Sequence, residues 1–358
     1  MKIVAILFFS AMCAFAKVSV SVSVIPQAFF VQKIAGNLAE VNIIVQKGKS
    51  PETYEPSIKE LDRLSKSQVY FTIGMPFERA LIERFESTNL KIIAPLQKGK
   101  LEAYLTEYGL DLADSHFHKD LGDFGSESNE SNHYSHESKR ESSADSRESK
   151  TKSSGESIID SSLTSQDLRE SSNKLPDLSL PNELQGESRS KKDERESHIH
   201  RHYPHILLSF KLSKAHAQVI CDNLCAIDSK NCATYKRNLA RFEKEIDKMF
   251  AHFKSVFRGK GVAFLVYHPA FSYLANELGL KEIAIEQDGK ETKSAHTKEI
   301  LKLIKKHKIK VIFIQPQFSS KNARAIAKEA KIAVKTADPL AFDWLENMNA
   351  FLSELERM

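Results

Sequence analysis

Short apolar runs alternate with amphipathic stretches along most of the chain, and this pattern predicts strands that alternate with helices. Residues 18–24, VSVSVSV, alternate strictly, which is typical of a strand with one buried face. Pro26 ends this strand, and residues 27–39 have helical spacing. Later apolar runs predict strands at 41–46, 69–74 and 91–96, with helices at 57–66 and 77–87. Strands that alternate with helices indicate a parallel, doubly wound α/β lobe.

This periodicity stops between residues 114 and 203, where Ser, Glu, Lys, Arg, Asp and Asn dominate. From 126 to 197 the chain has no Val, Phe, Trp, Met or Cys, so it cannot bury enough apolar surface to offset its conformational entropy. We interpret 114–203 as a disordered insertion. Its histidines cluster near its two ends: His116, His118, His133 and His136, then His198, His200 and His202.

Order is expected again from residue 204 onward. A helical segment at 212–227 precedes a longer one at 232–257, which would run roughly 37 Å at the rise of an α-helix. A second strand–helix series then follows to the end of the chain. The predicted fold is two Rossmann-like α/β lobes joined by one long rigid helix, with the His-containing insertion in the first lobe. The expected boundaries are 17–113 and 204–230 for the first lobe, 114–203 for the insertion, 231–257 for the linking helix and 258–358 for the second lobe.

The first 16 residues, MKIVAILFFSAMCAFA, have the pattern of a cleaved secretory signal peptide. A lysine precedes an apolar core, and Ala14-Phe15-Ala16 fits the cleavage site. We therefore expect export to the periplasm. The formal net charge is +5, and no basic stripe is interleaved with aromatic residues, which argues against a nucleic-acid partner.

Four polar residues stand where a ligand site would form. Glu52 lies in the loop after the second predicted strand, and His205 lies where the insertion ends. His268 and Asp338 each follow an apolar run in the second lobe. Ligands of open α/β sheets bind beyond the carboxyl ends of strands, and imidazole and carboxylate groups suit Zn²⁺. The chain has no dinucleotide fingerprint, P-loop, nucleophile elbow or HExxH motif.

Several motifs together resemble a known family. They read PETYEPS, PHILLS, HPAFSYLANELGL, IQPQFSSKNARAIAKEA and ADPL, and they extend over most of residues 18–358. This combination resembles the zinc- and manganese-binding periplasmic proteins of bacterial ABC importers, and the His-containing insertion resembles that of the zinc-specific branch. The resemblance implies two α/β lobes with one metal buried between them, and a membrane permease as partner. We expect a monomer.

The resemblance also implies a set of ligands. His205 and His268 match histidine ligands of the family, and Asp338 matches a carboxylate that binds the metal in some members. Glu52 stands where the family motif usually has histidine. A carboxylate there remains a legitimate zinc ligand but shifts the preference somewhat toward Mn²⁺. The sequence thus predicts a zinc carrier rather than an enzyme, with a manganese carrier and an exported metallohydrolase as alternatives.

The remaining histidines and the cysteines are expected to have smaller roles. The seven insertion histidines would bind metal weakly. Four histidines lie in amphipathic helices among Lys and Glu and are expected to face solvent: His216, His252, His296 and His307. Cys225 and Cys232 flank a plausible turn, so we expect a disulfide between them, which leaves Cys221 as a buried thiol.

Overall fold

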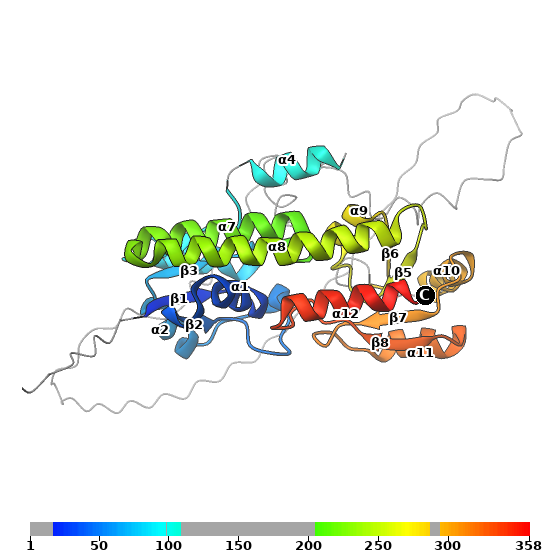
Figure 1. The fold of residues 1–358 in the computed structure, drawn as a ribbon. Helices are drawn as coiled ribbons and strands as arrows, with labels where there is room; N and C mark the ends of the chain where they lie inside the picture. The colour runs from blue at the N-terminus through cyan, green and yellow to red at the C-terminus, as the bar shows by residue number, and fades with distance from the viewer. Residues whose placement is uncertain (1–16, 98, 109–204, 287–293) are drawn as a thin grey trace, which may run out of the picture. The chain divides into compact units, whose positions relative to one another are not determined.

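A computed structural model describes residues 17–97, 99–108, 205–286 and 294–358 (Figure 1). It contains two four-stranded parallel sheets, one in each lobe, as the sequence predicts. The sheets share one topology, with strand orders β2-β1-β3-β4 and β6-β5-β7-β8. The strands of the first sheet are β1 (Val18–Val22), β2 (Ala39–Ile43), β3 (Val69–Phe71) and β4 (Lys91–Ile93). Those of the second are β5 (Ala263–Val266), β6 (Lys281–Ala284), β7 (Val311–Ile314) and β8 (Ala333–Thr336).

Strand β1 lies inside its sheet, and here the expectation of one exposed face is wrong. It pairs with β2 on one side and β3 on the other, and helices cover both faces. Ser21 and Ser23 are fully buried as a result. The Ser21 hydroxyl bonds that of Ser67 at 2.7 Å, which satisfies the polar group that the alternating pattern had assigned to solvent.

The helices of the first lobe begin mostly where the sequence predicts. They are α1 (Ile25–Ala35), α2 (Ile58–Ser65), α3 (Pro76–Phe85) and α4 (Lys100–Glu107). Pro26 lies in the first turn of α1, where a missing N–H costs no helical hydrogen bond. Helix α4 was not among the predicted helices, although Leu101, Tyr104 and Leu105 are buried at helical spacing.

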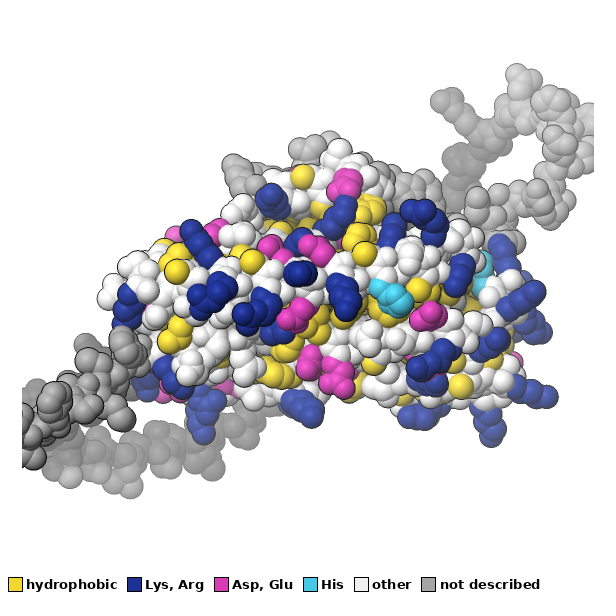
Figure 2. Space-filling model, in the orientation of Figure 1, with side chains coloured by type: hydrophobic (Ala, Val, Ile, Leu, Met, Phe, Trp, Pro, Cys, Tyr) yellow, Lys and Arg dark blue, Asp and Glu magenta, His cyan; other side chains and the backbone are white. Residues whose placement is uncertain are grey.

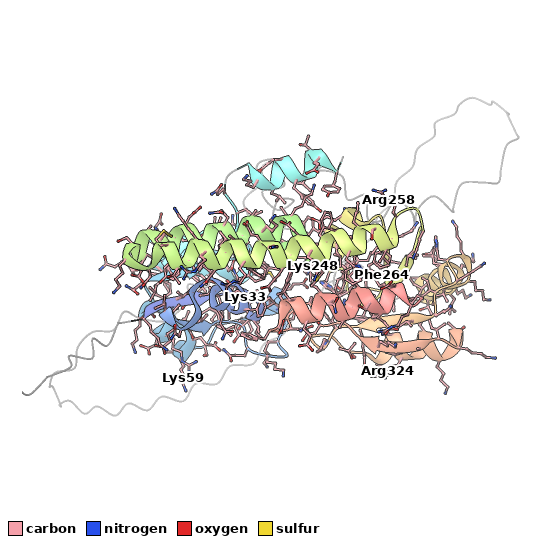
Figure 3. The ribbon with its side chains drawn as sticks, in the orientation of Figure 1. Lys33, Lys59, Lys248, Arg258, Phe264 and Arg324 are labelled. Atoms are coloured by element: carbon pink, nitrogen blue, oxygen red, sulfur yellow. A yellow bond between two sulfur atoms is a disulfide. The ribbon has the colours of Figure 1, made fainter. Side chains whose placement is uncertain are left out.

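Helix α7 (Phe210–Ile227) packs along α8 (Cys232–Phe257), and α8 runs from the first lobe to the second (Figure 1). Helix α8 contacts α1 of the first lobe and α9 (Ser272–Leu278) and α12 (Trp344–Glu356) of the second. Near one contact, Lys33, labelled in Figure 3, pairs with Glu245 at 2.6 Å. The predicted disulfide between Cys225 and Cys232 is confirmed, and Cys221 is free and buried.

Both faces of the second sheet are covered. Helices α8, α9 and α12 belong to one large apolar core that continues into the first lobe. Helices α10 (Ser294–Lys306) and α11 (Lys321–Ala330) cover the opposite face, through a separate cluster that includes Ile300 and Ile326. Charged side chains, mostly Lys and Arg, are scattered over the molecular face drawn in Figure 2.

Some predictions concern residues that the structure does not describe. These are the signal peptide at 1–16 and the insertion at 114–203 with its seven histidines. Within the described part of the chain, no helix has both the length and the apolar character needed to cross a membrane.

Candidate metal centre

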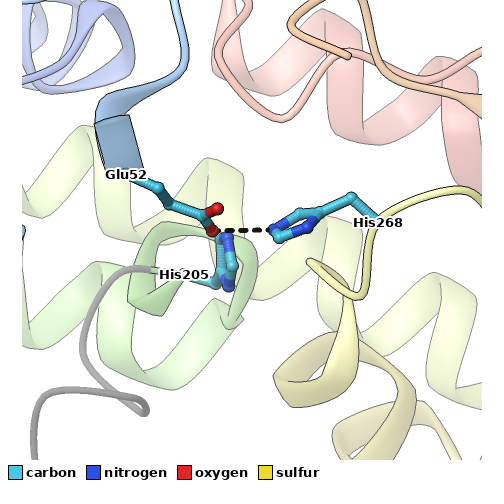
Figure 4. A group of neighbouring side chains, drawn as sticks. All are labelled: Glu52, His205 and His268. Carbon is cyan, nitrogen blue, oxygen red and sulfur yellow. Dashed lines mark ion pairs between the residues drawn. The ribbon is translucent and has the colours of Figure 1, made fainter. Parts of the chain in front are cut away.

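Three of the four predicted ligands come together from segments far apart in the sequence (Figure 4). Glu52 lies in the short 3₁₀ helix η2 (Pro51–Thr53), nine residues beyond the end of β2. His205 caps the 3₁₀ helix η4 (Ile206–Leu208), and His268 follows the end of β5. One carboxylate oxygen and one ring nitrogen from each histidine all lie within 4.8 Å of one another. Donor atoms at such spacing could share one metal ion.

His268 is the most firmly held of the three. Its side chain is buried, and its Nδ1 donates to Oε2 of Glu286 at 2.8 Å. Gln315 fixes its backbone from both sides, since its amide oxygen accepts from the His268 N–H and its amide nitrogen donates to the His268 carbonyl. The ring also stacks on Phe318, with centroids 4.5 Å apart. These contacts turn Nε2 toward Glu52 Oε1, 3.0 Å away.

The two histidines differ in pKa and therefore in charge at neutral pH. Burial alone would lower the pKa of His268, but its contacts with Glu286 and Glu52 outweigh burial and raise the pKa to about 9. Burial and the neighbouring charge of His268 lower the pKa of His205 to about 4, against an opposite effect of Glu52. At neutral pH the His205 ring is therefore uncharged, the form that binds a metal.

Glu52 carries the negative charge of the group. Burial pushes the pKa of its carboxyl upward, but the contact with His268 and the nearby His205 hold it below its usual value. The carboxylate is consequently ionised at neutral pH and available as a ligand.

Asp338 is not among the three converging side chains. Its Oδ1 accepts from Gln317 Nε2 at 2.7 Å and from the Leu340 N–H at 3.0 Å. Its neighbours nevertheless line the same pocket: Gln317, Pro339 and Leu340 are part of the wall around Glu52, His205 and His268. Asp338 thus lies next to the site with one oxygen engaged in other hydrogen bonds.

Sequence reasoning missed Glu286 and Gln315. Glu286 lies two residues beyond β6 and Gln315 one residue beyond β7, so both satisfy the rule that singled out His268. A carboxylate on the far nitrogen of a metal-binding histidine commonly fixes its tautomer and orientation. Polar residues at every strand end of the second sheet would therefore have been a usable signal.

The expectation of a solvent-facing His216 is wrong. The residue is fully buried in α7, on the same helical stripe as Leu212 and Ile220. Its Nδ1 donates to the Pro95 carbonyl at 2.7 Å, and its Nε2 lies 3.2 Å from Gln27 Nε2. The spacing of four residues from Leu212 was the available signal, and the neighbouring Lys and Glu obscured it.

Comparison with known proteins shows similarity to zinc-binding and other metal-binding proteins. Residues 20–358 match the model of a family described as ZnuA, zinc-uptake complex component A, periplasmic. The zinc-binding lipoprotein AdcA of Streptococcus pneumoniae is 30% identical over 150 residues, which is 40% of this chain and 30% of AdcA. A putative metal-binding protein of Treponema pallidum is 28% identical over 150 residues, 39% of this chain and 47% of that protein. The matched region thus spans well under two thirds of these curated relatives.

Solved structures share the fold. A crystal structure of ZnuA superposes with a TM-score of 0.64 at 24% identity, covering 95% of this chain and 98% of the other. The Zn(II)-bound AdcA from Streptococcus pneumoniae gives a TM-score of 0.59 at 18% identity, covering 96% of this chain and 57% of AdcA. At these identities the likeness establishes the two-lobed architecture.

Proposed function

The chain belongs to the family of periplasmic zinc-uptake components, and on that premise we propose that it is an exported carrier that captures Zn²⁺ between its lobes. It would deliver the ion to the membrane permease of an ABC importer, as a monomer freed of residues 1–16. The name of the family and that of zinc-binding AdcA support zinc as the cargo. No bond is made or broken in this function.

We propose that Glu52, His205 and His268 bind the metal directly. The observation that carries this is the separation between His268 Nε2 and Glu52 Oε1, which is 3.0 Å. Two ligands at zinc-binding distance in tetrahedral geometry are about 3.3 Å apart. The pair therefore needs to open by only a few tenths of an ångström to accept the ion.

Asp338 is our candidate for the fourth position. One of its oxygens would have to exchange hydrogen bonds with Gln317 and Leu340 for the metal. A water molecule is the alternative fourth ligand, and the weak sites that we propose for the insertion histidines would supply ions to the same cavity.

The test is metal analysis of protein purified without added metal, followed by competition titration of Zn²⁺ against Mn²⁺. We expect one tight Zn²⁺ equivalent. His205→Ala should lower its affinity by orders of magnitude, whereas replacing His198, His200 and His202 together should change it only a few-fold and remove weaker equivalents.

Other results would overturn the proposal. Loss of the tight equivalent in the triple variant together with its survival in His205→Ala would show that the wrong histidine had been chosen. Tighter binding of Mn²⁺ than of Zn²⁺ would make the protein a manganese carrier. Hydrolysis of ester or peptide substrates by the metal-loaded protein, lost in His268→Ala, would support the metallohydrolase alternative.

A further inference from the structure

The outward side of helices α10 and α11 forms a surface that the metal centre does not use. The two helices contact each other and cover one face of the second sheet. Their inner sides are apolar, with Ile300, Ile304 and Ile326 buried in the core beneath them. Their outer sides, together with the edge strand β8, face solvent.

This surface is strongly basic. From Lys298 to Lys335 the chain has eleven Lys and Arg residues, all exposed, and two acidic ones. Seven of these cations lie on α10 and α11 themselves. On α10, Lys298, Lys302 and Lys305 recur at the spacing of one helical face. On α11, Lys321, Arg324 and Lys328 do the same, and Arg324 is labelled in Figure 3. We call this the α10–α11 basic face.

The matching part of the first lobe has no such excess. Its helices α2 and α3 and strand β4 occupy the same places in the same topology as α10, α11 and β8. From Lys59 to Lys91 six Lys and Arg residues are balanced by five acidic ones. Because the whole chain carries only +5, the excess of cations in this part of the second lobe does not simply follow from the overall composition.

We propose that the α10–α11 basic face docks the carrier on the anionic surface of a lipid bilayer. Six of the seven cations on α10 and α11 are lysines, which act as hydrated point charges and need no fixed partner geometry. Each lysine close to an anionic bilayer contributes favourably to the free energy of membrane binding. The electrostatic potential of the bilayer extends about one Debye length from its surface. A carrier held near the membrane would search for its permease along a surface.

The aromatic side chains of this stretch argue against nucleic acid as the occupant. Base stacking requires exposed rings between the cations. Phe313 is buried in β7, and the ring of Phe318 stacks on His268. The face therefore offers charge without a stacking platform. Membrane docking rests on the proposed function only in one respect, namely that the carrier delivers its metal to a permease in a membrane.

The test is sedimentation of the purified full-length mature protein with vesicles of phosphatidylglycerol and phosphatidylcholine in equal parts, beside vesicles of phosphatidylcholine alone. One variant changes five cations of the face to Gln: Lys298, Lys302, Lys305, Arg324 and Lys328. A control variant with the same net charge changes five exposed cations of the first lobe to Gln: Lys47, Lys49, Lys59, Arg63 and Lys91. Neither set contains a proposed metal ligand.

We expect the unaltered protein to bind the anionic vesicles, to dissociate from them as the salt concentration rises, and not to bind the neutral vesicles. The variant of the basic face should lose at least about tenfold in vesicle binding, while the control stays within about twofold. Absence of preference for anionic vesicles overturns the proposal, as does an equal loss in both variants. Tighter binding of duplex DNA than of vesicles at equal phosphate concentration also overturns it. Zinc affinity, measured on all three proteins, reports separately on the proposed function.

Discussion

Glu277 offers a direct test of how the second lobe holds the His205 segment. This carboxylate of α9 is fully buried and accepts hydrogen bonds from the Ser209 hydroxyl, the Phe210 N–H at 2.8 Å and the Lys211 N–H at 3.2 Å. These donors lie at the start of α7, four to six residues after His205. A side chain of the lobe that bears His268 therefore caps the helix that follows His205, the other proposed histidine ligand.

The size of the effect follows from these contacts. In Glu277→Gln, the side-chain NH₂ group would replace one carboxylate oxygen and would face a backbone N–H. Two donors would then face each other, and an unsatisfied buried donor costs about 1–3 kcal/mol. The Trp344 indole also donates to the Leu207 carbonyl, so the segment would keep one anchor. If one or two residues near His205 become free until metal binds, ordering them costs about 1–2 kcal/mol each. We expect zinc affinity to fall roughly tenfold or somewhat more.

The matched control is Glu78→Gln in the first lobe. Glu78 is also buried and caps α3, accepting from the N–H groups of Ile73, Gly74 and Met75 at 2.7–2.9 Å. None of these bonds goes to a segment that carries a proposed ligand. Urea denaturation should give similar stability losses for both variants, while calorimetry with a competing chelator should show reduced zinc affinity only for Glu277→Gln. Unchanged affinity in that variant, or an equal fall in the control, would refute the reasoning.

Three further outcomes can be measured. Asp338→Ala should lower zinc affinity far less than His268→Ala, because one Asp338 oxygen already serves neighbouring groups; comparable losses in titration calorimetry would make Asp338 an essential ligand. Changing both Cys225 and Cys232 to Ser should cost about 2 kcal/mol of stability in urea denaturation, since the bridge closes a short loop; no loss would contradict this. Burial lowers the pKa of His216 to about 4, so its stabilising effect is complete above pH 6.5 and declines as the pH falls toward 4. Between pH 7 and 5 the unaltered protein should lose roughly 2 kcal/mol more than His216→Gln, and equal losses would exclude His216 as the source.

The architecture could be predicted because its signals are local. Apolar runs mark the eight strands, and the linking helix has the predicted bounds, Cys232–Phe257, because its apolar stripe is continuous. The half-exposed β1 was a wrong prediction, since the alternation of Val and Ser says nothing about what packs on the serine side. Only the tertiary partners, such as Ser67 for Ser21, reveal that both faces are covered.

The sequence predicted the proposed ligands of the candidate site but not the residues that support them. Glu52, His205 and His268 lie in motifs or at strand ends that can be found in the chain, and the structure brings their donor atoms together. Glu277 lies within the motif HPAFSYLANELGL and Glu286 lies just beyond a strand end, but neither position reveals which segment the side chain supports. Their roles depend on which segment lies opposite each of them in space, and sequence spacing does not contain that information.

Glu52 and Glu286 have different roles at the site, and this difference affects which metal the site prefers. Glu52 in place of a histidine suggested a site richer in oxygen, and oxygen ligands suit Mn²⁺ while imidazole suits Zn²⁺. Glu286 lies on the opposite side of the His268 ring from Glu52, and its oxygen is engaged by Nδ1 at 2.8 Å. It orients the ring and adds no oxygen to the group of three converging donors. That group therefore has two imidazole nitrogens and one carboxylate, and the two imidazole nitrogens favour zinc despite the substitution at residue 52, even with an oxygen ligand in the fourth position.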